Sequence, residues 1–312
     1  MATKILWVGA ASFTGMVDAT ASLYRRRLQA LAVVAAAMVA VVYILAERTT
    51  WGQRLDSTAL QGRRALDPRA VHAAARLLTT IDVASLALIG GAIVIVALVR
   101  GHPRLAVGAG TLIAGSVLTS ELLKHAVLTR PELGITDALG TKATYPSGHT
   151  TVAMSLGIAA MLVAPRRWRV AVGLVGAAYA SAIGIAVVAT ANHRPSDPIG
   201  AAFVVTAWTA AIAALLVVPD RRRDRDPSVK RAPSLIVLGG LVLIVTAFVG
   251  LAATIVAIRR NRLDTIELGG AFLTASTAIA GTVLLATGTI LAAVRDAHFE
   301  RHLEVAVPPT AA

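Results

Sequence analysis

The sequence predicts an all-α polytopic membrane protein with about eight spans. Of its 312 residues, 56% are apolar and only 15% are charged, whereas soluble domains are about 45–50% apolar and about 25% charged. The apolar residues also gather into runs close to the ~20 residues that a membrane-crossing helix needs. This distribution excludes a soluble enzyme, a disordered tail and a coiled coil.

The apolar runs and the polar gaps between them divide the chain into five segments. We expect an N-terminal segment at 1–27, a six-span body at 28–218, a basic linker at 219–233, a two-span tail at 234–294 and a C-terminal segment at 295–312. The expected spans are 28–46, 79–99, 105–123, 149–164, 170–190, 198–218, 234–258 and 268–294.

The basic residues predict the orientation of these spans. The formal net charge is +13, which in a soluble protein would suggest a nucleic-acid partner. Here the basic residues cluster in short gaps between apolar runs, as they do on the cytoplasmic side of membrane proteins. With a cytoplasmic N-terminus, the inner gaps hold 17 of the 30 Lys and Arg residues. We therefore expect an integral membrane protein with both termini cytoplasmic and no nucleic-acid partner. Only four of the 30 basic residues are lysine, which suggests a GC-rich genome, and we expect the membrane to be a bacterial plasma membrane.

Three short polar stretches lie at the predicted outer ends of the third to sixth spans. They are residues 124–131, 145–150 and 192–197. The predicted topology puts all three on one face of the membrane, although the spans were assigned from apolar runs alone. We therefore expect the stretches to form one site.

The second and third stretches contain residue types suited to phosphate chemistry. Ser147 is placed to cap a helix, which puts Gly148 and His149 in the first turn, where free N–H groups bind anions. His193 and Asp197 are four residues apart, so the carboxylate is within reach of one ring nitrogen and would leave the other as a nucleophile.

The first stretch adds two positive charges, on Lys124 and Arg130. Arginine can bind a phosphate through two donors. Each feature alone also has a structural interpretation: a lysine at a span end is usually an anchor, and Glu121 is placed to form an i,i+3 ion pair with Lys124. The ordered set on one face favours a phosphate site.

Taken together, these residues resemble the type 2 phosphatidic acid phosphatase (PAP2) superfamily, in its membrane-bound branch. The family motifs are Lys-x6-Arg-Pro, Pro-Ser-Gly-His and Ser-Arg-x5-His-x3-Asp. Residues 146–149 match the second motif fully, and His193 and Asp197 match the end of the third. The resemblance covers about 100–218 and implies a six-helix PAP2-like body at 28–218, with the last two spans as a C-terminal extension.

The sequence departs from the family motifs at two points. The first motif is one residue short between its lysine and its arginine, and the Ser-Arg pair of the third motif is replaced by Ala186 and Val187. The third motif is therefore degenerate and lacks a phosphate-binding arginine. Arg194 and Lys142 are auxiliary candidates for the missing charge.

The resemblance implies a hydrolase that acts on a lipid phosphate or a (poly)prenyl pyrophosphate at the extracytoplasmic face, through a phosphohistidine. His193 would be the nucleophile, Asp197 would orient it, and His149 would protonate the leaving group. The phosphate would be held by Lys124, Arg130, Ser147 and Gly148. No metal and no other cofactor is expected, and the partners are the lipid substrate and membrane lipids. The alternative is a non-catalytic lipid-phosphate binding, carrier or assembly protein on the same body.

Two further features admit more than one interpretation. Asp82 either orders the pocket or lies near the membrane interface. The long loop 47–78 either rests on the membrane surface or caps the pocket, and its arginines are further candidates for the missing phosphate contact: Arg63, Arg64, Arg69 and Arg76.

Overall fold

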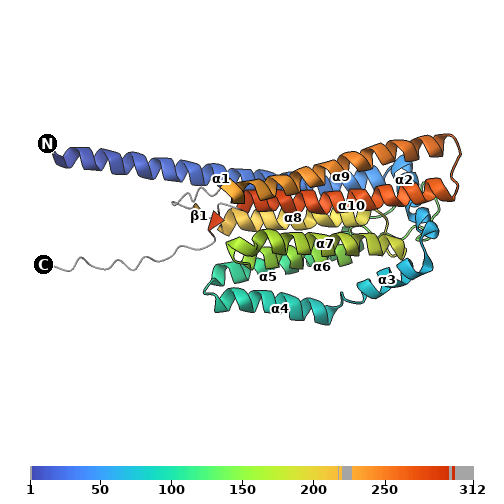
Figure 1. Ribbon diagram of the computed structural model, residues 1–312, viewed down its shortest axis with the longest axis horizontal. Helices are drawn as coiled ribbons and strands as arrows, with labels where there is room; N and C mark the ends of the chain where they lie inside the picture. The colour runs from blue at the N-terminus through green and yellow to red at the C-terminus, as the bar shows by residue number, and fades with distance from the viewer. Residues whose placement is uncertain (1, 217, 220–226, 295–296, 299–312) are drawn as a thin grey trace.

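The fold is a bundle of long helices (Figure 1). The computed structural model describes residues 2–216, 218–219, 227–294 and 297–298, and this part of the chain contains ten α-helices. They are α1 (Ala2–Glu47), α2 (Thr50–Gln61), α3 (Pro68–Leu78), α4 (Val83–Val99), α5 (Pro103–Leu122), α6 (Gly148–Val163), α7 (Arg169–Ala189), α8 (Ser196–Leu216), α9 (Pro227–Arg259) and α10 (Thr265–Val294).

Shorter elements complete the description. A 3-10 turn, Gly62–Ala65, follows α2, a π-helical turn, Leu123–Val127, extends α5, and a second 3-10 turn, Arg166–Trp168, precedes α7. Two-residue strands β1 (Val218–Pro219) and β2 (Ala297–His298) pair antiparallel. Residues 220–226 of the predicted linker 219–233 and most of the predicted C-terminal segment 295–312 lie outside the described residues, and residues 227–233 of the predicted linker belong to α9. The predicted boundary after residue 27 falls inside α1.

Six helices are long and apolar enough to cross a membrane, and these spans indicate an integral membrane protein. They are Ser22–Glu47, Pro103–Val127, Arg166–Ala189, Ser196–Leu216, Ala232–Arg259 and Thr265–Val294. The pair α3 and α4, which bends by 58° at its break, makes a seventh if it is counted as one span. The described residues therefore support six or seven spans instead of the expected eight.

Local features explain why the expected spans 79–99 and 149–164 are not among these six helices. Asp82 caps α4 by accepting a hydrogen bond from the Ser85 amide, and the Ser85 hydroxyl oxygen accepts one from the Asp82 amide, so a new helix starts inside the predicted span 79–99. The helix α6 has 16 residues, or about 24 Å, which is shorter than the ~30 Å hydrocarbon core. It ends before Pro165, and Arg100 and Arg169 donate to its last carbonyls.

The helix α6 lies inside the bundle. Its neighbours are α5, α7, α8 and α4, and most of its side chains are buried. It approaches α7 at backbone distance, because a Cβ atom placed on Gly176 would lie 2.8 Å from the Cα of Gly157. Around this centre, α1 packs on α8, and α10 packs on α7, α8 and α9.

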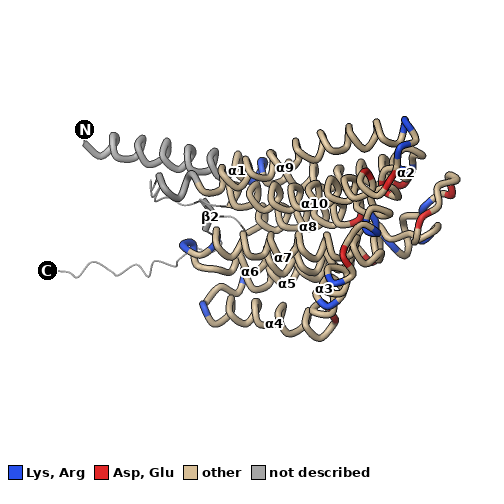
Figure 2. Tube along the Cα trace, turned by 45° about the vertical axis from the view of Figure 1, so that its right-hand side comes forward, with Lys and Arg blue, Asp and Glu red and all other residues tan. Residues whose placement is uncertain are grey.

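Most of the charged residues lie at the two ends of the bundle (Figure 2). At the end where α1 and α5 finish and α6 and α8 begin, acidic and basic residues are mixed. The turns at the opposite end, α4–α5 and α6–α7, carry Arg100, Arg104, Arg166, Arg167 and Arg169 and no acidic residue. The chain therefore has one mixed end and one end whose described turns are purely basic.

Candidate functional site

The three polar stretches meet at the mixed end of the bundle. The first follows α5, the second leads into α6, and the third connects α7 to α8. The rings of His149 and His193 lie edge to face, with their centroids 6.4 Å apart. The structure therefore brings together the two histidines that the sequence predicts to share a site.

A buried carboxylate orients His193. The Nδ1 atom of His193 lies 2.9 Å from Oδ2 of Asp197, and the Arg194 amide donates to the same oxygen at 2.9 Å. Asp197 is fully buried in the first turn of α8. This contact leaves Nε2 as the ring nitrogen that faces away from the carboxylate, and a neutral imidazole that donates from Nδ1 has its lone pair there.

The amino end of α6 is tied directly to the histidine loop. Ser147 caps α6 by accepting a hydrogen bond from the Thr150 amide, and its own amide donates to the Asp197 carbonyl at 3.0 Å. The Ser147 N–H is therefore already used within the protein. The amides of Gly148 and His149 are the first-turn donors that remain for an anion.

Lys124 reaches this same helix end. It lies in the π-helical turn after α5 and forms the predicted ion pair with Glu121, at 2.7 Å. A Cβ atom on Gly148 would lie 3.3 Å from the Lys124 Nζ and 2.8 Å from a Glu121 oxygen. Glycine at position 148 therefore leaves the space in which the lysine approaches the first turn of α6.

Arg130 is buried and contacts carboxylates. It forms an ion pair with Glu47, at the end of α1, and its Nη2 atom lies 4.0 Å from an Asp137 oxygen. That distance is too long for a hydrogen bond, and the Arg130 Nη2 and the Glu47 Oε1 are buried without a hydrogen-bond partner. The predicted phosphate ligand is therefore paired, with one donor atom unused.

The side chain of Arg194, which was predicted as an auxiliary phosphate ligand, makes five hydrogen bonds inside the protein. It binds both oxygens of Asp137, at 2.9 and 3.0 Å, and also the carbonyls of Gly140 and Lys142 and the hydroxyl of Thr144. Burial alone would raise the pKa of Asp137, but the hydrogen bonds and the charge of Arg194 outweigh it and lower the pKa. Because its five N–H donors are used, Arg194 holds the 137–144 loop. Lys142, the other auxiliary candidate, is exposed.

Sequence reasoning missed three acidic residues in this region: Glu47, Asp56 and Asp137. Asp56, in α2, accepts hydrogen bonds from the amide and the hydroxyl of Ser196. Burial and the neighbouring Glu47 charge raise its pKa to about 8. Of the three, only Glu47 had a feature in the sequence that could have identified it, because it is an acid directly at the end of the first apolar run. Asp56 and Asp137 lie in polar gaps and carry no such signal.

Asp82 and the arginines of the long loop 47–78 are the remaining candidates. Asp82 is exposed and caps α4, which is a structural role. The arginines at 64, 69 and 76 are exposed and the one at 63 is half-buried. Within the described residues, no group of three His, Cys, Asp or Glu side chains is arranged to hold a metal ion.

The helices α5, α6, α7 and α8, which position these residues, also match a known protein family. Residues 105–223 match the PAP2 superfamily. This PAP2 segment runs from α5 through α8 and contains every residue of the histidine site, together with Lys124, Arg130 and Asp137. No curated protein and no solved structure matches the chain. The helices α1, α9 and α10, with Glu47 and Asp56, lie outside the PAP2 segment.

Proposed function

We propose that the protein is a membrane phosphatase that hydrolyses a lipid phosphate or a (poly)prenyl pyrophosphate at the extracytoplasmic face. The observation that carries this proposal is the pair of histidine rings 6.4 Å apart, with one ring bonded to a buried carboxylate. The match of residues 105–223 to the PAP2 superfamily supports it, because that match contains the whole pair.

In the proposed first step, Nε2 of His193 attacks phosphorus and forms a nitrogen–phosphorus bond as the bond to the leaving oxygen breaks. Asp197 accepts the Nδ1–H hydrogen bond and stabilises the positive charge that develops on the ring. His149 donates a proton to the leaving oxygen, so that the lipid departs as an alcohol or a monophosphate. Water then attacks the phosphohistidine, with His149 taking its proton, and inorganic phosphate is released.

The phosphate oxygens would be held by Lys124, by Arg130 and by the first turn of α6. The unused Nη2 atom of Arg130 and the amides of Gly148 and His149 are suited to this task, because charge-assisted hydrogen bonds stabilise the charge of the transition state. Ser147, whose amide donates to Asp197, would act by fixing the helix end.

The extracytoplasmic orientation rests on the basic turns. Cytoplasmic loops carry an excess of Lys and Arg, and the described turns at the end opposite the histidines carry arginines without acids. A cytoplasmic location for that end places the histidine pair outside, beside lipid of the outer leaflet.

A non-catalytic lipid-phosphate binding, carrier or assembly protein is the second candidate. Two observations favour it. Lys124, Arg130 and Arg194 each contact a carboxylate, and positions 186 and 187 offer no replacement cation. A site that binds phosphate without turning it over would fit these pairs.

Phosphate release by the purified full-length protein distinguishes the two functions. We expect release from phosphatidic acid, phosphatidylglycerol phosphate or a polyprenyl pyrophosphate, and its abolition by His193→Ala. The matched control is Asn192→Ala, the exposed neighbour, which should keep wild-type turnover. Wild-type activity in His193→Ala would refute the mechanism, and binding of these lipids without release would establish the second candidate.

A further inference from the structure

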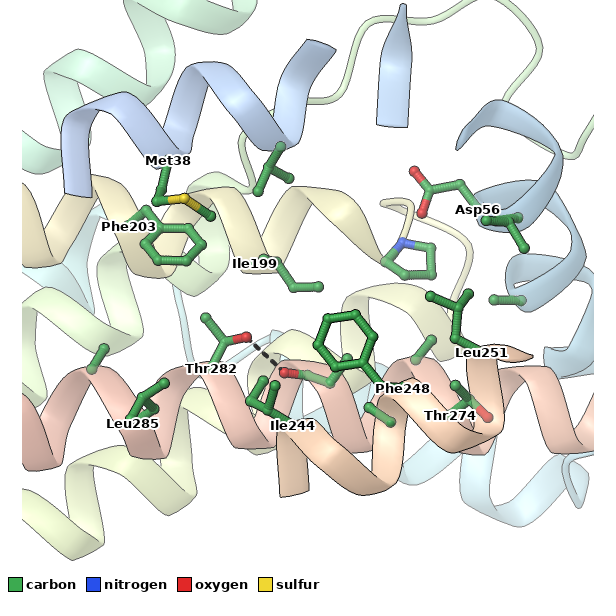
Figure 3. Close-up of a pocket in the computed structure, with 18 of the residues that line it drawn as sticks. Met38, Asp56, Ile199, Phe203, Ile244, Phe248, Leu251, Thr274, Thr282 and Leu285 are labelled. Atoms are coloured by element: carbon green, nitrogen blue, oxygen red, sulfur yellow. Dashed lines mark hydrogen bonds between the residues drawn. The ribbon is translucent and has the colours of Figure 1, made fainter. Parts of the chain in front are cut away.

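A long apolar slot lies between α1 and α9 (Figure 3). Its volume is about 580 Å³, within the ~300–1,000 Å³ typical of ligand sites. The helices α8 and α10 form its floor, because α1 packs on α8 while α9 packs on α10. Among the described residues that line it, Asp56 alone has an ionisable side chain.

The slot opens sideways toward the surface that a membrane would cover. Val34 of α1 and Phe248 of α9 both line it, yet they are 59% and 65% exposed. Along α10 the lining runs from Ala271 to Thr289, which is about 27 Å of helix and close to the ~30 Å hydrocarbon core. Its shape and depth therefore suit an extended hydrocarbon chain. Such a chain would supply the lining side chains with van der Waals contacts that they lack when the slot is empty.

Two arginines and a tryptophan lie at the end of the slot formed by α2. The Trp51 ring has the guanidinium of Arg54 5.6 Å from its centroid and that of Arg259 5.7 Å away. Arg54 precedes the lining residue Leu55, and Arg259 follows the lining residue Thr254 by about one helical turn. Tryptophan is enriched at membrane interfaces, and arginine binds phosphate through its fork of donors.

We propose that the slot binds one anionic phospholipid of the surrounding bilayer, with a hydrocarbon chain between α1 and α9 and its phosphate at Arg54 and Arg259. The apolar slot with its lateral opening suits the hydrocarbon chain of such a lipid, and the two cations at one end suit its phosphate. The bound lipid fills the gap between α9 and α1 and so adds a contact between these two helices.

This lipid is distinct from the substrate proposed above. At the start of α8, Ser196 donates to Asp56 on the slot side, whereas the adjacent Asp197 binds His193. The slot and the histidine pair therefore lie on different faces of the same helix end. Neither histidine lines the slot.

Lipid binding to the delipidated full-length protein, followed by native mass spectrometry, tests the proposal. We expect wild type to bind one dioleoyl-phosphatidylglycerol per chain. Ala278→Phe, which fills the slot, should weaken binding at least tenfold, whereas Ala252→Phe, at an exposed position of α9 outside the slot, should bind as wild type. Equal binding by the two variants, or none by wild type, would overturn the proposal.

A second set of variants tests the proposed contact between the lipid phosphate and the two arginines. Wild type should prefer phosphatidylglycerol over phosphatidylcholine, the double variant Arg54→Gln with Arg259→Gln should lose that preference, and the neighbouring Arg260→Gln should keep it. An equal affinity of wild type for the two lipids would refute the role of the arginines. If Ala278→Phe does not fold, Ala247→Leu narrows the opposite wall. His193→Ala should bind this lipid as wild type does. A negative result for the proposed phosphatase activity can therefore be distinguished from a negative result for the lipid site.

Discussion

At the scale of single residues, each cation of the site is paired before any phosphate arrives. The pairs are Lys124–Glu121, Arg130–Glu47 and Arg194–Asp137. Charges removed from water are costly unless they are compensated, and these carboxylates supply the compensation. An incoming phosphate must therefore share or displace a carboxylate at Lys124 and Arg130, while Arg194 has no donor left to offer.

The first prediction concerns Arg194. We expect Arg194→Met to lower the stability of the protein by about 3–5 kcal/mol, because it leaves the buried Asp137 carboxylate without the cation that compensates its charge. Lys142→Met, at an exposed position of the same loop, should have little effect. Thermal unfolding of the two variants in detergent measures the difference, and a similar stability for both would contradict the loop-holding role.

The second prediction follows from the pKa of Asp56, which burial raises to about 8. Between about pH 4 and pH 8 the folded state keeps a proton that the unfolded state has released, so the contribution of Asp56 to stability falls as pH rises, by about 1.4 kcal/mol per pH unit, and levels off above pH 8. Asp56→Asn should remove this part of the slope.

Unfolding temperatures of wild type and Asp56→Asn between pH 5 and pH 8 measure this effect. The exposed Asp67→Asn serves as the control and should retain the wild-type slope. If Asp56→Asn and wild type lose stability in parallel over this range, Asp56 is ionised in the folded protein and the prediction is wrong.

At the scale of elements, the contact between α6 and α7 determines where the histidines lie. The helix α6 begins at the turn that carries His149, and α7 leads into the loop that carries His193. Gly157 and Gly176 let the two helices touch at their backbones. The distance between these two helices is therefore fixed in the interior of the bundle, well away from the site.

The third prediction tests this contact. Gly176→Val forces the helices apart and should cost about 1–3 kcal/mol of stability, as overpacking does, with a loss of phosphate release beyond the loss of folded protein. Gly91→Val, in α4 at a position with open space around its Cβ, is the matched control. Thermal unfolding and the activity per folded molecule are the two measurements, and normal values for Gly176→Val would contradict the role of the contact.

The long apolar helices could be predicted from the sequence, because their signal is a local run of apolar residues. Two of the expected spans contain helices too short to cross a membrane alone, since the helix of 79–99 begins only after the Asp82 cap and the helix of 149–164 has 16 residues. The predicted meeting of His149 and His193 is observed, and so is the Glu121–Lys124 pair. The partners of Arg130 and Arg194 could not be predicted, because they are acids 83 and 57 positions away in the chain.

At the scale of the whole molecule, the distribution of charge predicts how the protein sits in a membrane. The sequence contains no cysteine, so single cysteines report the accessibility of one position at a time. We expect a membrane-impermeant maleimide to label Lys142→Cys on intact cells and to label Arg167→Cys, in the α6–α7 turn, only after the cells are opened. The reverse pattern would invert the orientation and place the histidine pair in the cytoplasm.

The Glu47–Arg130 ion pair has a consequence for dissecting the protein. Arg130 belongs to the PAP2 segment 105–223, whereas Glu47 belongs to α1, which lies outside it. A fragment cut at the family boundary would keep a guanidinium in the protein interior and discard the carboxylate that neutralises it. The segment that matches the family is therefore not a transplantable module, and grafting it onto another scaffold requires a replacement acid for Glu47.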